Sequence, residues 1–135
     1  MPELEPDRLA IKYVNEINRH DLDAMSALMA PDFWFIDSLG QEVRGRERMI
    51  EAWKSYFTTY PDYRIVLRDH LTMGSVVALF GTASGTVAVG AELPHANRWS
   101  FPAAWRAVVR GGQLAEWQVY ADNEPVRKIL GARRP

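Results

Sequence analysis

Residues 97–120 read NRWSFPAAWRAVVRGGQLAEWQVY and predict two neighbouring β-strands. Apolar side chains, three of them aromatic, recur at alternate positions from Trp99 to Trp105, which is the period of a strand with one buried face. The Gly111-Gly112 pair permits a tight reversal of the chain, and a second strand follows from Leu114 to Tyr120. We therefore expect a long β-hairpin in the second half of the sequence.

Two further strands precede this hairpin. Residues 63–72 alternate between apolar and polar side chains, and residues 76–89 form a long apolar stretch. Gly81 and Gly85 lie inside that stretch, and glycines within a strand indicate a bulge or a strong bend. The sheet is therefore expected to curve.

The first half of the chain has helical periodicity. We expect three helices, at residues 7–20, 21–29 and 46–60. Asp7 and Asp21 are the expected N-caps of the first two, and Pro31 and Pro61 follow the second and third.

Short elements complete the pattern. The aromatic segment 33–37 and residues 42–44 predict two short strands, and Asp122 opens a C-terminal helix. Helices followed by a run of antiparallel strands predict an α+β fold. A curved antiparallel sheet packed on N-terminal helices gives a cone with an apolar interior.

Length and composition limit the possible functions. The chain has 135 residues, so we expect a single domain over residues 1–135. Its net charge of −1 argues against nucleic-acid binding, because such proteins carry a basic excess. The absence of cysteine excludes disulfides and thiolate sites. Neither a membrane span nor a signal peptide is recognisable, so we expect a cytoplasmic protein.

Short signatures along the chain resemble a known superfamily. They are DLDAMSALMAPDF at 21–33, a strand ending in Asp37, a Gly45-Arg46-Glu47 helix start and LAEWQVYAD at 114–122. The chain resembles the nuclear-transport-factor-2-like superfamily, in its SnoaL-like polyketide-cyclase and ketosteroid-isomerase-like branch. The resemblance implies a cone-shaped α+β barrel with a pocket at its open end, and a homodimer formed through the outer face of the sheet.

The resemblance also implies site residues. Asp37 matches the carboxylate base of ketosteroid isomerases, and Tyr13 on the first helix matches their oxyanion-hole tyrosine. Trp53 stands where those enzymes have a supporting tyrosine, and Ala103 stands where they have an oxyanion-hole acid. The cyclases of this branch use a pocket aspartate, for which Asp37 and, less well, Asp122 are available. Epoxide-hydrolase chemistry is disfavoured, because this sequence lacks the Asp-Arg-Asp set.

Both proposed catalytic residues have a structural alternative. Asp37 could cap the turn at residues 38–40, because aspartate often binds its own backbone two residues on. Tyr13 could be a core tyrosine with its hydroxyl at the rim. If Asp37 and Tyr13 face one cavity, they provide a base and an oxygen-polarising donor.

Aromatic and apolar side chains supply a candidate pocket. The chain contains five Trp, five Tyr and five Phe residues, which suit a dense core or a ring-lined cavity. The expected substrate-binding residues are Ile17, Phe33, Phe35, Trp53, Phe57, Trp99, Phe101, Ala103, Trp117 and Val119. The loop at residues 90–96 is long enough to cover it.

Neither a metal nor a cofactor is expected. The three histidines are scattered without a metal-binding spacing. The sequence thus predicts an acid–base enzyme that isomerises, cyclises or dehydrates a hydrophobic carbonyl compound such as a polyketide, steroid or terpenoid. Two alternatives stay open: a non-catalytic protein that binds such a ligand, and a structural dimerisation domain.

Overall fold

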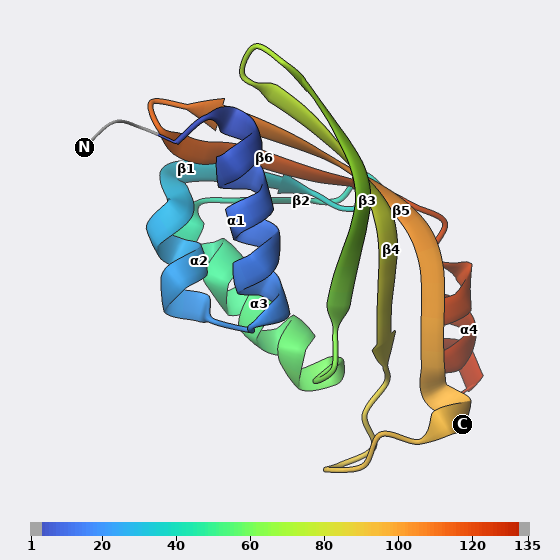
Figure 1. Ribbon diagram of the computed structural model, residues 1–135. Coiled ribbons are helices and arrows are strands. Elements are labelled where there is room, and N and C mark those ends of the chain that lie inside the picture. The colour runs from blue at the N-terminus through green and yellow to red at the C-terminus, as the bar shows by residue number, and fades with distance from the viewer. Residues whose placement is uncertain (1–3, 133–135) are drawn as a thin grey trace.

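The computed structural model describes residues 4–132 as four α-helices, one 3-10 helix and six strands. The start of the chain at residues 1–3 and its end at residues 133–135 lie outside the described residues. Figure 1 shows α1, α2 and α3 gathered on one side of a bent sheet. The expected α+β fold is confirmed.

The helices begin and end close to their predicted limits. They are α1 (Pro6–Asn18), α2 (Leu22–Leu28), α3 (Arg46–Thr59) and α4 (Glu124–Ala132). The Asp21 carboxylate accepts a hydrogen bond from the Ala24 amide at 3.0 Å, which confirms it as the N-cap of α2. The prediction for Asp7 is wrong: Glu5 is the N-cap of α1, and Pro6 occupies the first turn, where a missing N–H costs nothing.

The strands are β1 (Met29–Ile36), β2 (Glu42–Arg44), β3 (Arg64–Met73), β4 (Val76–Thr86), β5 (Arg98–Arg110) and β6 (Gln113–Tyr120). They form one sheet in the order β2-β1-β6-β5-β4-β3. Two predicted limits need correction: β1 starts at Met29, directly after α2, and β4 ends at Thr86 rather than at residue 89. The 3-10 helix His95–Asn97 lies in the predicted loop.

The sheet is not wholly antiparallel as predicted. β1 and β6 run parallel, with Phe35 opposite Trp117, and every other neighbouring pair is antiparallel. A parallel pair needs a crossover, and here the chain between β1 and β6 provides it. The pairing places the carboxyl ends of β1 and β6 at the same edge of the sheet.

A β-bulge bends the sheet where glycine is required. Arg68 is the extra residue, because Leu67 pairs with Gly81 whereas Asp69 already pairs with Phe80. A Cβ atom on Gly81 would overlap the Val66 carbonyl oxygen, so only glycine fits there. The prediction that an interior glycine marks a bulge is confirmed.

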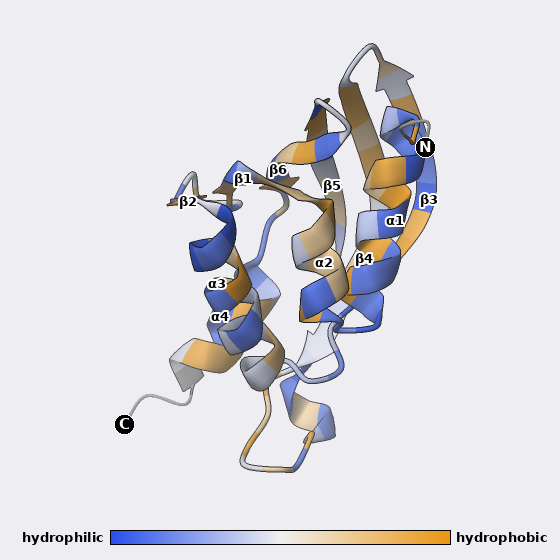
Figure 2. Cartoon of the chain, turned by 90° about the vertical axis from the view of Figure 1, so that its left-hand side faces the viewer, coloured by the Kyte–Doolittle hydropathy of each residue, from blue (hydrophilic) through white to orange (hydrophobic). Residues whose placement is uncertain are grey.

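The core lies between the helices and the concave face of the sheet. The largest fully buried side chains include Trp105, Trp117, Tyr13 and Phe33. In Figure 2, apolar and polar segments alternate along α1, as expected for a helix that buries one side. No helix within residues 4–132 is long and apolar enough to span a membrane.

Candidate active site

A cavity of about 250 Å³ lies between α3, the concave face of the sheet and the start of α4. Its wall is mostly aromatic and aliphatic. The lining residues are Phe35, Asp37, Ser38, Met49, Ala52, Trp53, Tyr56, Tyr60, Tyr63, Ala83, Phe101, Trp105, Trp117, Val119, Ala121, Asn123 and Val126.

Helix α3 supplies one side of the cavity. Met49, Ala52, Trp53 and Tyr56 occupy positions i, i+3, i+4 and i+7, which places them on one face of the helix. Tyr60 is the C-cap residue of α3 and extends this face. The first helix, in contrast, contributes no lining residue.

Asp37 lines the cavity and also holds a turn. Its Oδ1 accepts hydrogen bonds from the Leu39 amide at 2.9 Å and the Gln41 amide at 2.8 Å. The Asp37 amide in turn donates to the Gln41 carbonyl at 2.8 Å. Both side-chain bonds use Oδ1, so the turn-capping role and a position at the cavity coexist in one carboxylate.

Tyr13 is buried in the core and is not a lining residue. Its ring packs against Phe33 and Trp117, with centroid distances of 6.2 and 4.9 Å. The Trp53 indole N–H donates a hydrogen bond to its hydroxyl at 2.8 Å. Burial raises the pKa of Tyr13 far above its ordinary value, and the nearby Tyr63 hydroxyl raises it further.

Three tyrosines that the sequence analysis did not select line the cavity together. The ring of Tyr56 lies 4.7 Å from that of Tyr60 and 4.9 Å from that of Tyr63, measured between centroids. Burial raises the pKa of all three hydroxyls. The helical face that contains Trp53 and Tyr56 could have indicated Tyr60, but no local pattern links Tyr63 to them across Pro61.

The predicted substrate-binding residues fall into two groups. Phe35, Trp53, Phe101, Trp117 and Val119 line the cavity. Ile17, Phe33, Phe57, Trp99 and Ala103 do not.

The second group lies behind the cavity wall or away from it. Ile17 and Phe33 are fully buried core residues. Phe57 stacks on His20 at a centroid distance of 3.9 Å. Trp99 is buried and stacks on the lining residue Phe101 at a centroid distance of 5.1 Å.

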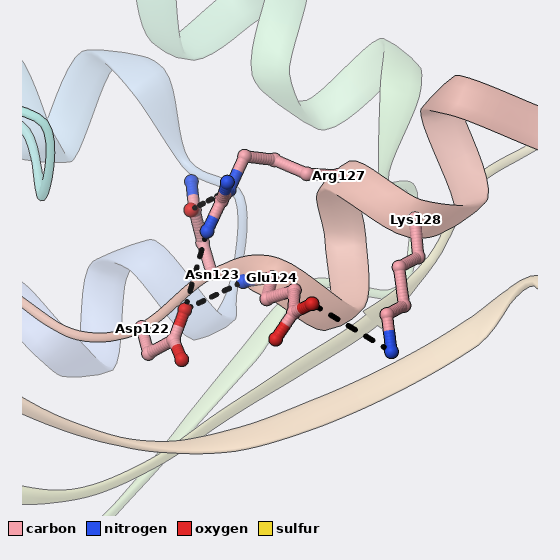
Figure 3. A network of polar contacts seen from close by, with 5 residues as sticks. All are labelled: Asp122, Asn123, Glu124, Arg127 and Lys128. Atoms are coloured by element: carbon pink, nitrogen blue, oxygen red, sulfur yellow. Dashed lines mark hydrogen bonds and ion pairs between the residues drawn. The ribbon is translucent and has the colours of Figure 1, made fainter.

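The other candidate carboxylate, Asp122, lies at the start of α4. Its Oδ1 accepts a hydrogen bond from the Glu124 amide at 3.0 Å and lies 3.3 Å from the Arg127 guanidinium. Figure 3 shows this cluster, in which Asn123 Oδ1 also accepts a hydrogen bond from Arg127 at 2.8 Å. Asn123, and not Asp122, lines the cavity.

Comparison with known proteins identifies the family. The model of the SnoaL-like domain matches residues 10–117, which is most of the chain. The chain belongs to the SnoaL-like family. A search of curated proteins finds no match.

Solved structures share the fold of this SnoaL-like domain at low identity. A proposed SnoaL-like polyketide cyclase from Jannaschia sp. CCS1 is 20% identical with a TM-score of 0.81, and the match covers 98% of this chain and 95% of that one. IdmH, a proposed polyketide cyclase from Streptomyces antibioticus, is 22% identical with a TM-score of 0.78, covering 95% and 99%. A protein with a ketosteroid-isomerase-like fold from Catenulispora acidiphila DSM 44928, in complex with trimethylamine, is 16% identical with a TM-score of 0.78, and the match covers 94% of this chain and 97% of that one.

The cavity of this SnoaL-like domain has a simple charge pattern. Asp37 is the one formally charged side chain among the lining residues of the described chain, and Lys, Arg and His are missing from that set. Within residues 4–132, no group of three His, Asp or Glu side chains is arranged to hold a metal ion. The arrangement can place one carboxylate and several hydroxyl donors against an apolar ligand.

Proposed function

We propose that this SnoaL-like domain is a cofactor-free acid–base enzyme that acts on a hydrophobic carbonyl compound. The observation that carries the proposal is a single carboxylate, Asp37, on the wall of an otherwise uncharged aromatic cavity. A carboxylate beside apolar rings can reach the acidic C–H bond of a ligand that packs against those rings.

In the proposed reaction, Asp37 removes a proton from the carbon next to the carbonyl group. The electron pair of that C–H bond becomes the new C=C bond, and the carbonyl π-pair moves to the oxygen to give an enolate. In a substrate with a C=C bond β,γ to the carbonyl, the charge extends to the γ-carbon, and return of the proton from Asp37 to that carbon completes an isomerisation. In a cyclisation, the enolate carbon attacks a second carbonyl, and the alkoxide that forms takes the proton back from Asp37. In a dehydration, a β-hydroxyl group leaves with that proton as water.

The test is proton exchange at a carbon acid. We expect the protein to accelerate the exchange of the methyl protons of 2-acetylnaphthalene in D₂O, followed by NMR, and Asp37→Asn to lower the accelerated rate by about 10²–10⁴-fold. Asparagine keeps an oxygen for the Leu39 and Gln41 amides, so the turn is retained. Equal exchange in the wild type and the variant contradicts the proposal.

The hydrogen bonds of Asp37 favour one alternative, a ligand-binding protein without turnover. A carboxylate that only holds the β1–β2 turn does not take part in a reaction. In that case the affinity for 2-acetylnaphthalene would be the same in the wild type and in Asp37→Asn, and neither protein would accelerate exchange.

We also propose that the outer face of the sheet forms a homodimer. Phe80 pairs with Ala104 and Ala104 with Tyr120, so these residues form one row across the sheet. The side chains of Phe80 and Tyr120 are 40% and 51% exposed, and the Arg106–Glu116 ion pair at 3.3 Å lies beside them. Apolar residues with a charged rim are typical of an interface.

Sedimentation velocity tests the dimer. Tyr120→Glu should shift the protein towards monomer, because it places a charge within the apolar row. Asp32→Ala, at an exposed position outside that row, serves as the control. A wild type that sediments as a monomer contradicts the dimer.

A further inference from the structure

The proposed base needs a partner that receives the negative charge of the substrate oxygen, and this inference rests on the proposed function. We propose that the hydroxyl groups of Tyr56, Tyr60 and Tyr63 form an oxygen-binding subsite for an uncharged carbonyl compound of one or two rings. The subsite lies in the same cavity as Asp37.

The three tyrosines come from adjoining segments of the chain. Tyr56 is on the cavity face of α3, Tyr60 is its C-cap residue, and Tyr63 directly precedes β3. The Tyr63 amide donates a hydrogen bond to the Tyr60 carbonyl at 3.0 Å, which fixes the turn between them. Tyr60 and Tyr63 are each 7% exposed, so folding and packing set their positions.

Neighbouring aromatic side chains hold the cluster rigid. Tyr63 contacts Trp53 at a centroid distance of 6.1 Å, and Tyr60 packs edge-on against Trp99 at 5.3 Å. A rigid set of donors loses little entropy when it receives a ligand, which is the condition for effective charge stabilisation.

The hydroxyls are neutral donors throughout the physiological pH range. Burial raises the pKa of Tyr60 and Tyr63, and for Tyr56 both burial and the neighbouring tyrosines raise it. A neutral tyrosine O–H donates to a carbonyl oxygen, and the bond strengthens as enolate charge develops. The tyrosine hydroxyls would take the place of the oxyanion-hole acid, which this chain lacks because Ala103 stands at that position.

Tyr13 acts in this scheme as a positioning residue. It lies outside the cavity lining, yet its hydroxyl accepts the Trp53 indole N–H at 2.8 Å and lies close to Tyr63. Trp53 itself lines the cavity. Tyr13, which the sequence analysis proposed as a catalytic residue, therefore helps to fix Trp53 beside two of the three tyrosines.

Charge and size define the ligand class. A carboxylate or phosphate on the ligand would be buried near Asp37 without a cationic side chain in the described lining, which is unfavourable. The cavity of about 250 Å³ is smaller than the ~300–1,000 Å³ typical of sites for drug-sized ligands. Uncharged compounds of one or two rings meet both conditions.

The experiment compares three ligands of one shape. They are 2-acetylnaphthalene, its hydrocarbon isostere 2-isopropenylnaphthalene and the anion 2-naphthoate, each titrated against the tryptophan fluorescence of the full chain. We expect the ketone to bind about fivefold more tightly than the isostere, as one net hydrogen bond would give, and naphthoate to bind at least tenfold more weakly than the ketone.

Tyrosine variants locate the effect. Tyr56→Phe, Tyr60→Phe and Tyr63→Phe keep the rings and remove one hydroxyl each. At least one should abolish the preference for the ketone over the isostere, with affinity for the isostere unchanged. Thr72→Val, which removes a hydroxyl at an exposed position outside the cavity lining and the proposed dimer row, should change neither affinity. If Tyr63→Phe fails to fold, Tyr60→Phe still tests the subsite, because Tyr60 is the C-cap residue of α3 and lies outside the helix proper.

The outcomes separate this proposal from the preceding one. A ketone preference that survives all three tyrosine substitutions, or naphthoate binding equal to ketone binding, overturns the subsite. Failure of the wild type to bind either uncharged compound overturns it as well. A preference lost in the tyrosine variants together with unchanged exchange in Asp37→Asn supports the subsite and removes Asp37 as base.

Discussion

At the ends of strands β1 and β6, an aspartate side chain caps the following turn in nearly the same way, but the surroundings of the two carboxylates differ. The two strands are parallel neighbours, so Asp37 and Asp122 leave the sheet at the same edge. Each carboxylate accepts a hydrogen bond from the amide two residues later, Leu39 in one case and Glu124 in the other. Asp37 faces the cavity, whereas the Asp122 side chain is 76% exposed and paired with Arg127.

The comparison shows that a local motif does not fix the role of its carboxylate. The aspartate–turn bond is the same in both regions. The surroundings differ, because α3 and the aromatic face of the sheet enclose one carboxylate and a cationic side chain of α4 neutralises the other. The surroundings of each carboxylate are therefore set by residues distant in sequence.

The largest expected effect tests that difference directly. Asp122→Asn should leave the exchange of 2-acetylnaphthalene within about twofold of the wild type, whereas Asp37→Asn should lose about 10²–10⁴-fold. NMR of both variants under one set of conditions provides the measurement. Similar losses of exchange rate in the two variants would mean that the two carboxylates act together, which would contradict the contrast drawn between them.

The next effect concerns stability. Asp37→Ala removes the acceptor of two backbone amides and should lower the free energy of unfolding by about 1–2 kcal/mol, whereas Asp37→Asn should lower it by less than about 0.5 kcal/mol. Urea denaturation of both variants measures the difference. Asp122→Ala, which removes one amide acceptor, is the matched control, with an expected cost of about 0.5–1 kcal/mol.

The smallest effect concerns the ion pair that distinguishes Asp122. Arg127→Ala should lower the free energy of unfolding by about 0.5 kcal/mol, because exposed pairs contribute little. Added salt should reduce the difference between this variant and the wild type, since the pair is screened. A cost well above 1 kcal/mol would show that Arg127 has a larger packing role than its exposure suggests.

Much of the fold follows from local patterns. The N-cap at Asp21, the limits of β2 and the bulge opposite Gly81 were each predicted from a few neighbouring residues. The parallel pairing of β1 with β6 was not, because residue alternation shows which side chains share a face but gives no information on strand direction or order.

The candidate site was less accessible to sequence reasoning. The structure places Asp37 among the residues that line the cavity, and its catalytic role stays a prediction. Tyr13 has the same helical spacing as a core residue, and its contact with Trp53 joins positions 40 residues apart. Tyr63 was assigned to the alternation of a strand, and nothing in that pattern indicates that its ring packs against that of Tyr56 on α3.

The parallel pairing of β1 with β6 also bears on the order of folding. Phe35 and Trp117, which lie opposite each other, are separated by about 80 positions, whereas β3, β4, β5 and β6 are joined by shorter connections. Closing the longer loop costs more chain entropy, so the four-strand meander should form before β1 joins it. Since β1 contributes Phe35 and leads into Asp37, the cavity would be the last part of the molecule to assemble.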